Sequence, residues 1–181
     1  MNNKIPKEIF LSAQGLKMFQ DRLEKQREAH AKICHEREVA HELSGDGWHD
    51  NPHFNYLQQM ESNSSWKIFE TQEILNHAKK YDVIEGQRPT KRVTYGSVVK
   101  CVVIDLKTDE EREHVIEIVG YEEGNPNQHQ VSYVAPLGKA LMGLAEGDDR
   151  ETRLPQGEVY IDSIKLFKSR EDAGLVSTLS S

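Results

Sequence analysis

The sequence predicts an α+β fold, in which an N-terminal antiparallel α-helical coiled-coil hairpin precedes a small β-rich domain. Two long stretches repeat apolar residues at steps of three and four, which is typical of helices that pack along one seam. A glycine-containing break separates these stretches, and the second half of the chain holds short runs rich in Val, Ile and Tyr. We therefore predict a hairpin over residues 1–86 with its tip at 45–51, a β-rich domain over 87–168 and a tail over 169–181.

The first helical pattern begins near Ser12, a residue type suited to the N-cap, and continues to about Leu43. A helix of this length extends about 45 Å at a rise of about 1.5 Å per residue. Its seam positions are Leu16, Phe19, Leu23, Gln26, His30, Ile33, Arg37 and Ala40. The polar members weaken the coil locally and set its register, and His30 and Arg37 could also pair with a carboxylate of the other helix, such as Glu61.

The second helical pattern follows a tight reversal. The glycines of Ser44-Gly45-Asp46-Gly47 supply the positive φ that such a turn needs. Asp50 or Asn51 can then cap the next helix, and Pro52 suits its first turn. The seam of this helix is Phe54, Leu57, Glu61, Ser64, Ile68, Thr71, Leu75 and Ala78. Since a short connection makes the two helices antiparallel neighbours, the turn lies at the end of a hairpin.

The β-rich half begins after a linker marked by Gly86 and Pro89. Strands are predicted at Ser97–Ile104, Glu113–Val119, Gln130–Val134 and Glu158–Phe167, with a short helix after Pro136. From about residue 168 onwards the sequence is rich in serine and weakly patterned, so we expect a frayed tail there.

Composition excludes several classes of protein. The net charge is −7, whereas a free-standing nucleic-acid-binding protein usually carries a basic face. Cys34 and Cys101 are too far apart for a disulfide framework or a zinc ligand set, and they are interpreted as reduced thiols. No apolar run is long enough to span a membrane, and the start of the chain does not resemble a signal peptide. We therefore predict a cytoplasmic protein.

Two segments make the interpretation more specific. One is the predicted tip, Gly45-Asp46-Gly47-Trp48-His49-Asp50-Asn51. The other is Val131-Ser132-Tyr133-Val134-Ala135-Pro136-Leu137-Gly138-Lys139-Ala140-Leu141-Met142-Gly143, with Gly147-Asp148 soon after. The order and spacing of these segments, together with Tyr95-Gly96-Ser97-Val98-Val99 and Ile118-Val119-Gly120-Tyr121 between them, resemble the GreA/GreB family of transcription elongation factors. The resemblance covers about residues 12 to 167.

The resemblance implies a mechanism. Such factors dock an FKBP-like C-terminal domain at the rim of the secondary channel of RNA polymerase and pass the hairpin down that channel. Acidic residues at the tip help to hold a second Mg²⁺ at the polymerase's own active centre, and the polymerase then cleaves backtracked RNA. The factor is no enzyme by itself, needs no cofactor of its own and meets nascent RNA, and possibly DNA, only indirectly. We expect a monomer, because a free tip must enter a narrow channel.

Three groups of site residues are predicted, and the resemblance implies the acidic pair and the docking residues among them. The catalytic and Mg²⁺-holding pair is Asp46 and Asp50. The tip contacts are Trp48, His49 and Asn51. The polymerase-docking residues are Pro136, Leu137 and Gly138.

The sequence also departs from the family pattern. Three residues separate Asp46 from Asp50 where the family has two, and Asp50 stands where the family often has glutamate. Val134 and Ala135 replace residues that tend to be polar in the family. These departures keep open a second hypothesis, a secondary-channel regulator that inhibits or modulates transcription without cleavage. A third hypothesis is a coiled-coil interaction protein outside transcription.

Simpler interpretations stand beside these functions. Asp46 and Asp50 could be ordinary turn and cap residues. His49 and His53 have the spacing of a transition-metal pair, but Pro52 between them disfavours a continuous helix. Trp66 and Phe69 are interpreted as packing residues of the second helix. Prolyl isomerase activity would need an aromatic-lined pocket, for which the second half of the chain offers few aromatic residues.

Overall fold

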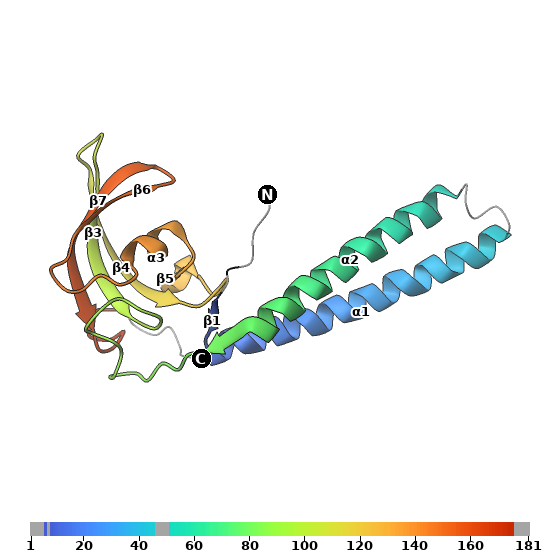
Figure 1. Cartoon of the computed structure of the whole chain (residues 1–181), viewed down its shortest axis with the longest axis horizontal. Helices are drawn as coiled ribbons and strands as arrows, with labels where there is room; N and C mark the ends of the chain where they lie inside the picture. Colours follow the sequence, from blue (N-terminus) through green and yellow to red (C-terminus); the bar gives the residue numbers. More distant parts are fainter. Residues whose placement is uncertain (1–5, 7, 46–50, 176–181) are drawn as a thin grey trace. The chain divides into compact units, whose positions relative to one another are not determined.

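Residues 6, 8–45 and 51–175 are described by the computed structural model, and the chain divides into two compact units. One unit contains residues 16–78, and the other contains residues 9–15 together with the chain from residue 79 onwards. Helices make up the first unit and a curled β-sheet dominates the second, which confirms the predicted α+β class (Figure 1). The second unit includes residues 79–86, which the sequence pattern grouped with the hairpin.

The first unit is a hairpin of α1 (Ala13–Ser44) and α2 (Pro52–His77), which lie side by side (Figure 1). The 32 residues of α1 give it a length of about 48 Å. The Ser12 hydroxyl accepts a hydrogen bond of 3.0 Å from the Gly15 N–H, as expected of an N-cap. At the start of α2, Asn51 is the cap and Pro52 occupies the first turn. The predicted helices and their boundaries are therefore confirmed.

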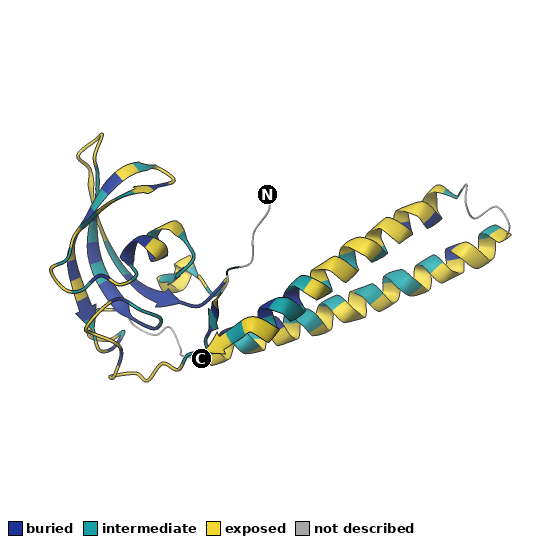
Figure 2. Cartoon of the chain, viewed as in Figure 1, coloured by how far each residue is buried: buried dark blue, intermediate teal, exposed yellow. Residues whose placement is uncertain are grey.

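The hairpin has a sparse interior. Its buried residues are Phe19, Ala40, Phe54, Leu57, Thr71 and Ile74. Exposed and intermediate residues dominate the rest of both helices (Figure 2). Trp66 and Phe69 are 60% and 49% exposed, and their ring centroids lie 5.5 Å apart. Their interpretation as packing residues is therefore wrong, because both rings contact each other at the surface of α2.

A five-stranded sheet forms the centre of the second unit. Its strands are β3 (Val98–Asp105), β4 (Glu111–Val119), β5 (Gln130–Ser132), β6 (Arg150–Leu154) and β7 (Gly157–Phe167), in the order β5-β4-β3-β7-β6. The β4–β5 pair is parallel and the other pairs are antiparallel. The short elements are η2 (Pro126–Gln128) and α3 (Pro136–Leu141). The four predicted strands and the short helix are present, whereas β6 was not predicted.

The core of this unit lies between the sheet and α3. Strands β3, β4 and β7 supply residues such as Val99, Ile118 and Ile161, and α3 adds Ala140 and Leu141. Burial of this apolar surface is the main driving force for folding the unit. Figure 2 shows the buried positions concentrated on these strands.

Side-chain contacts attach residues 9–15 to the rest of the second unit. β1 (Ile9–Leu11) pairs with β2 (Ala78–Lys80) in a separate two-stranded sheet. The Phe10 ring stacks on Tyr95 at a centroid distance of 4.1 Å, and the Phe10 N–H donates to the Tyr133 hydroxyl at 3.3 Å. The Ser12 N–H and hydroxyl donate to the Glu123 carboxylate at 2.8 and 2.5 Å. The start of α1 therefore has a defined anchor.

A buried ion pair links the segment before the sheet to β4. Arg88 and Glu117 are 7% and 6% exposed, and an Arg88 guanidinium nitrogen lies 2.7 Å from Glu117 Oε1. The same nitrogen donates to the Gly96 carbonyl at 2.8 Å, and the Arg88 Nε donates to Glu85 at 2.8 Å. These bonds compensate the loss of hydration that burial imposes on both charges.

Residues that follow β7 join the same network. The Arg170 guanidinium donates to Glu117 Oε2 and to the Gln128 carbonyl. The backbone N–H of Arg170 donates to the Glu85 carboxylate. Leu175 is buried. The prediction of a frayed tail is therefore wrong for residues 169–175, because a second arginine satisfies the buried Glu117 carboxylate. Residues 176–181 lie outside the described residues.

Glu85 responds electrostatically to this network. Burial opposes its ionisation, but the Arg170 N–H and the Arg88 guanidinium together lower the pKa of the Glu85 carboxyl. A lowered folded-state pKa means that ionised Glu85 stabilises the fold above the carboxyl's unfolded pKa. This contribution is lost as the pH falls through the folded-state pKa.

Within the described ranges, neither long helix combines the length and apolar character needed to cross a membrane.

Candidate functional site

Four of the predicted tip residues, Asp46, Trp48, His49 and Asp50, lie outside the described residues. The proposed catalytic and Mg²⁺-holding role of the two aspartates therefore stays a prediction, as do the contacts of Trp48 and His49. What the structure describes is the two helix ends between which this segment lies, at Gly45 and Asn51.

Asn51 joins these two helix ends. Its side-chain oxygen accepts from the backbone N–H groups of His53 and Phe54, which caps α2. Its Nδ2 donates to the Ser44 hydroxyl at 2.5 Å, and that hydroxyl donates to the Ala40 carbonyl at 2.6 Å. One asparagine therefore uses both ends of its amide to tie the last turn of α1 to the first turn of α2.

An apolar cluster lies next to the Asn51–Ser44 hydrogen bond, between the end of α1 and the start of α2. Ala40, Phe54 and Leu57 are all buried together, and the His41 ring approaches Phe54 with centroids 5.7 Å apart. A hollow of about 410 Å³ adjoins the cluster and is lined by Arg37, Glu38, His41, Glu42, Phe54 and Gln58. The cluster packs the last turns of α1 against the first turns of α2.

Leu43 is an accessible apolar residue near the tip that sequence reasoning missed. It is 84% exposed and lies two residues before Gly45. It does not fall on the seam, because the step that follows Ala40 is one of four residues. An apolar residue off the seam and next to a turn was the available signal.

Replacing Asn51 by alanine is expected to lower the stability of the hairpin by about 1–2 kcal/mol, because α2 loses its cap and α1 loses a bond to Ser44. Urea unfolding followed by far-ultraviolet circular dichroism measures this loss. Gln59→Ala, at an exposed position on the same helix, is the matched control and should change stability little. Equal stability of the two variants would contradict the assigned role of Asn51.

The predicted docking segment is the first turn of α3. Pro136 is exposed, Leu137 is half-buried against the core, and Gly138 is buried. The Ser132 carbonyl oxygen would lie 2.2 Å from a Cβ at position 138, so only glycine fits there without a shift. Pro136 and part of Leu137 are therefore available to a partner, whereas Gly138 allows α3 to approach β5 closely.

Replacing Gly138 by alanine is expected to destabilise the second unit by about 1–3 kcal/mol, because the new Cβ meets a backbone carbonyl that cannot rotate away. Thermal unfolding gives the size of the loss. Lys139→Ala is the control at the adjacent exposed position of α3. If Gly138→Ala is as stable as this control, the close approach of α3 to Ser132 is incorrect.

The chain is similar to known proteins over most of its length. Residues 88–166 match the family model described as the C-terminal domain of the transcription elongation factor GreA/GreB. A GreA transcription elongation factor of Acetivibrio thermocellus is 32% identical over 166 residues, which cover 90% of this chain and 98% of that protein. The GreA of Nautilia profundicola is 37% identical over 138 residues, covering 75% of this chain and 80% of its own length.

Solved structures are also similar to this chain. The GreA homologue Gfh1 of Thermus aquaticus is 22% identical and covers 89% of this chain and 99% of its own, with a TM-score of 0.39. A GreA/GreB elongation factor from Nitrosomonas europaea is 21% identical and covers 88% and 98%, with a TM-score of 0.32.

Proposed function

Since the chain belongs to the GreA/GreB family of transcription elongation factors, we propose that it binds RNA polymerase and enters the secondary channel with its hairpin. There it stimulates the cleavage of backtracked RNA by the polymerase itself. The factor adds no active site of its own to this reaction; it completes one that the polymerase already has.

The observation that carries the proposal is the position of the aspartates on the hairpin. Asp46 and Asp50 belong to the segment that connects α1 and α2 in the sequence. The hydrogen bond from Asn51 to Ser44 joins the end of α1 to the start of α2. A helix of about 48 Å separates such a segment from the opposite end of the hairpin by about the same distance. Carboxylates that must act inside another protein need a rigid support of this kind.

The donor set fits the chemistry. Carboxylate oxygens are the protein ligands that Mg²⁺ prefers. A second metal ion at the polymerase centre, when bound, would help to orient and activate the attacking water. In this proposal Asp46 is the principal ligand carrier and Asp50 assists it. The Asn51 amide is engaged by Ser44 and by the first N–H groups of α2, so we assign Asn51 to shaping the turn.

The second unit supplies the docking surface in this proposal. Pro136 and Leu137 offer accessible apolar surface at the start of α3, and Gly138 sets the position of that turn. Contacts there would hold the factor on the polymerase while the hairpin occupies the channel.

Transcript cleavage in stalled, backtracked complexes of the cognate polymerase tests the proposal. The wild-type protein should shorten the 3′ end of the RNA in the presence of Mg²⁺, and the protein without polymerase should leave the same RNA intact. The absence of any shortening, with the factor bound to the polymerase, would rule out cleavage stimulation.

A second candidate function is inhibition of transcription from the same channel. The three-residue separation of Asp46 from Asp50, where two residues are usual in the family, favours it, because a displaced second carboxylate could occupy the site without completing it. Slower elongation without shortened RNA would support this function over cleavage. Failure to bind core polymerase at all would instead favour a coiled-coil partner outside transcription.

A further inference from the structure

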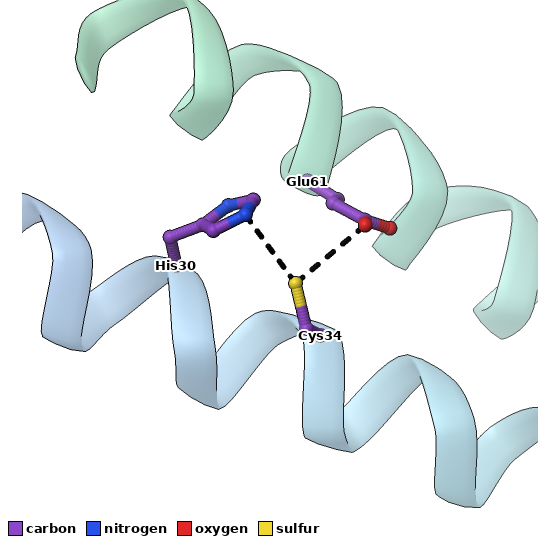
Figure 3. Close-up of side chains that lie close together, drawn as sticks. All are labelled: His30, Cys34 and Glu61. Atoms are coloured by element: carbon purple, nitrogen blue, oxygen red, sulfur yellow. Dashed lines mark hydrogen bonds between the residues drawn. The ribbon is translucent and has the colours of Figure 1, made fainter.

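We propose that the hairpin carries a Zn²⁺ site formed by His30 and Cys34 of α1 and Glu61 of α2. One nitrogen, one sulfur and one carboxylate oxygen of these residues lie within 4.8 Å of one another, and all three side chains are partly buried between the helices (Figure 3). The site is separate from the tip and from the docking segment, and it does not depend on the proposed function in transcription.

The spacing of the ligands follows from the helices. His30 and Cys34 are four residues apart and therefore share one face of α1. Glu61 reaches them from the facing side of α2 (Figure 3). The Cys34 sulfur lies 3.5 Å from the His30 Nε2 and 3.5 Å from the Glu61 Oε1. Tetrahedral Zn²⁺, with bonds of about 2.0–2.3 Å, separates its ligand atoms by about 3.3–3.8 Å.

Neighbouring bonds orient the histidine for this role. The Ser64 hydroxyl donates to the Glu61 backbone carbonyl at 2.9 Å, so its oxygen is left to accept from the His30 Nδ1, 2.7 Å away. This pattern assigns the proton to Nδ1. The lone pair of Nε2 then faces Cys34, and a hydrogen bond on the other ring nitrogen is the usual support of a metal-bound histidine.

The carboxylate is oriented in a similar way. The Arg37 Nε forms an ion pair with Glu61 Oε2 at 2.8 Å, whereas Oε1 accepts from the Cys34 thiol. Glu61 can therefore give one oxygen to a metal ion and keep its ion pair through the other. Burial and the Glu61 carboxylate raise the pKa of the Cys34 thiol. When Zn²⁺ binds, the thiol proton passes to solvent and the thiolate takes its place as ligand.

The identity of the metal follows from the ligand types. Thiolate and imidazole together favour Zn²⁺ over Mg²⁺ or Ca²⁺, which prefer oxygen. The two anionic ligands neutralise the charge of the ion. Three protein ligands leave the fourth tetrahedral position to water.

The place of the site on the hairpin gives it a structural effect. No residue between Phe19 and Ala40 on α1, or between Leu57 and Thr71 on α2, is buried; both stretches lie wholly within the described part of the chain. The middle of the hairpin therefore has only partly buried apolar residues, such as Leu23, Ile33 and Ile68. A metal ion shared by His30, Cys34 and Glu61 would join the two helices where little else does.

Titration of the full-length, metal-free protein with Co²⁺ tests the site. We expect one tetrahedral Co²⁺ per chain with a thiolate-to-metal charge-transfer band, displaced by one equivalent of Zn²⁺. Cys34→Ser should abolish the band, and His30→Gln and Glu61→Gln should each weaken binding by more than about 100-fold, since loss of a residue that only hydrogen-bonds to a metal ligand already costs about 10- to 100-fold. Zn²⁺ should also raise the unfolding temperature of the helices in the wild-type protein but not in these three variants.

Two control variants match these changes. His35→Gln removes an exposed histidine next to Cys34, and Cys101→Ala removes the cysteine buried in the β-rich unit. Both should bind Co²⁺ as the wild type does. The proposal is overturned if the wild type shows no charge-transfer band, or if the Co²⁺ signal survives Cys34→Ser, which would locate the metal elsewhere. Because no polymerase is present, neither result bears on transcript cleavage.

Discussion

Replacing Asp46 by alanine is expected to reduce the stimulated rate of RNA cleavage by roughly 100-fold or more. The basis is the proposed role of Asp46 as the main carboxylate delivered to the second Mg²⁺ of the polymerase. Removing one group that stabilises developing charge at an active centre typically costs roughly 100- to 1,000-fold in rate. The measurement is single-turnover cleavage in backtracked complexes at saturating factor.

Binding must be separated from catalysis in this experiment. Asp46→Ala should still compete with the wild-type factor for the polymerase, because docking is assigned to the start of α3. Asp21→Ala, at an exposed position on α1, is the control and should cleave at the wild-type rate. Full cleavage by Asp46→Ala would show that this carboxylate is not the principal ligand.

Asp50→Ala tests the unusual tip spacing by the same assay. If Asp50 assists Asp46 despite the extra residue between them, its loss should lower cleavage by a smaller factor than the loss of Asp46. No effect of Asp50→Ala would mean that the wider spacing has removed the second carboxylate from the reaction, and that one aspartate suffices.

Local patterns made the long elements predictable. The steps of three and four located α1 and α2, and Asn51 followed by Pro52 located the start of α2. Runs of β-branched residues located β3 and β7 in the same way. In each case the residues that decide the structure are close together in the sequence, so a single periodicity reveals them.

Elements decided by distant partners were not predictable. The strand β6 reads Arg-Glu-Thr-Arg-Leu, and only Leu154 of it is buried, so an edge position in the sheet hides its strand character. β1 and β2 have three residues each and depend on each other. Arg88 and Glu117 resemble ordinary surface charges until the fold brings them together.

The His30, Cys34 and Glu61 cluster was missed for a different reason. The distance between Cys34 and Cys101 in the sequence excludes a zinc site built from both cysteines, but not one in which Cys34 joins other ligand types. The sequence did contain an indication of a site with mixed ligand types: His30 and Cys34 are four residues apart, and Glu61 lies on the seam of the other helix. Predicting it would have required the register of the two helices, which the polar seam residues themselves help to determine.

Glu117→Gln is expected to destabilise the second unit by about 3–5 kcal/mol, because it removes the buried carboxylate that pairs with the Arg88 guanidinium and leaves only the more exposed Glu85 as its charged partner. The Arg170 guanidinium loses the same carboxylate, so the segment after β7 should detach as well. Native-state hydrogen exchange of the β3 and β4 amides measures the stability of this unit separately from the hairpin.

The matched control lies on the same strand. Glu113 of β4 pairs with Lys100 at 2.6 Å, but the two side chains are 55% and 37% exposed. Glu113→Gln should therefore cost less than about 1 kcal/mol. The double variant Arg88→Met with Glu117→Leu should be more stable than Glu117→Gln alone, because it removes both members of the buried ion pair. Suppose that Glu117→Gln lowers stability no more than Glu113→Gln does. The buried ion pair then does not hold Arg88 and residues 169–175 on β4. Apolar contacts such as those of Leu175 must position these segments instead.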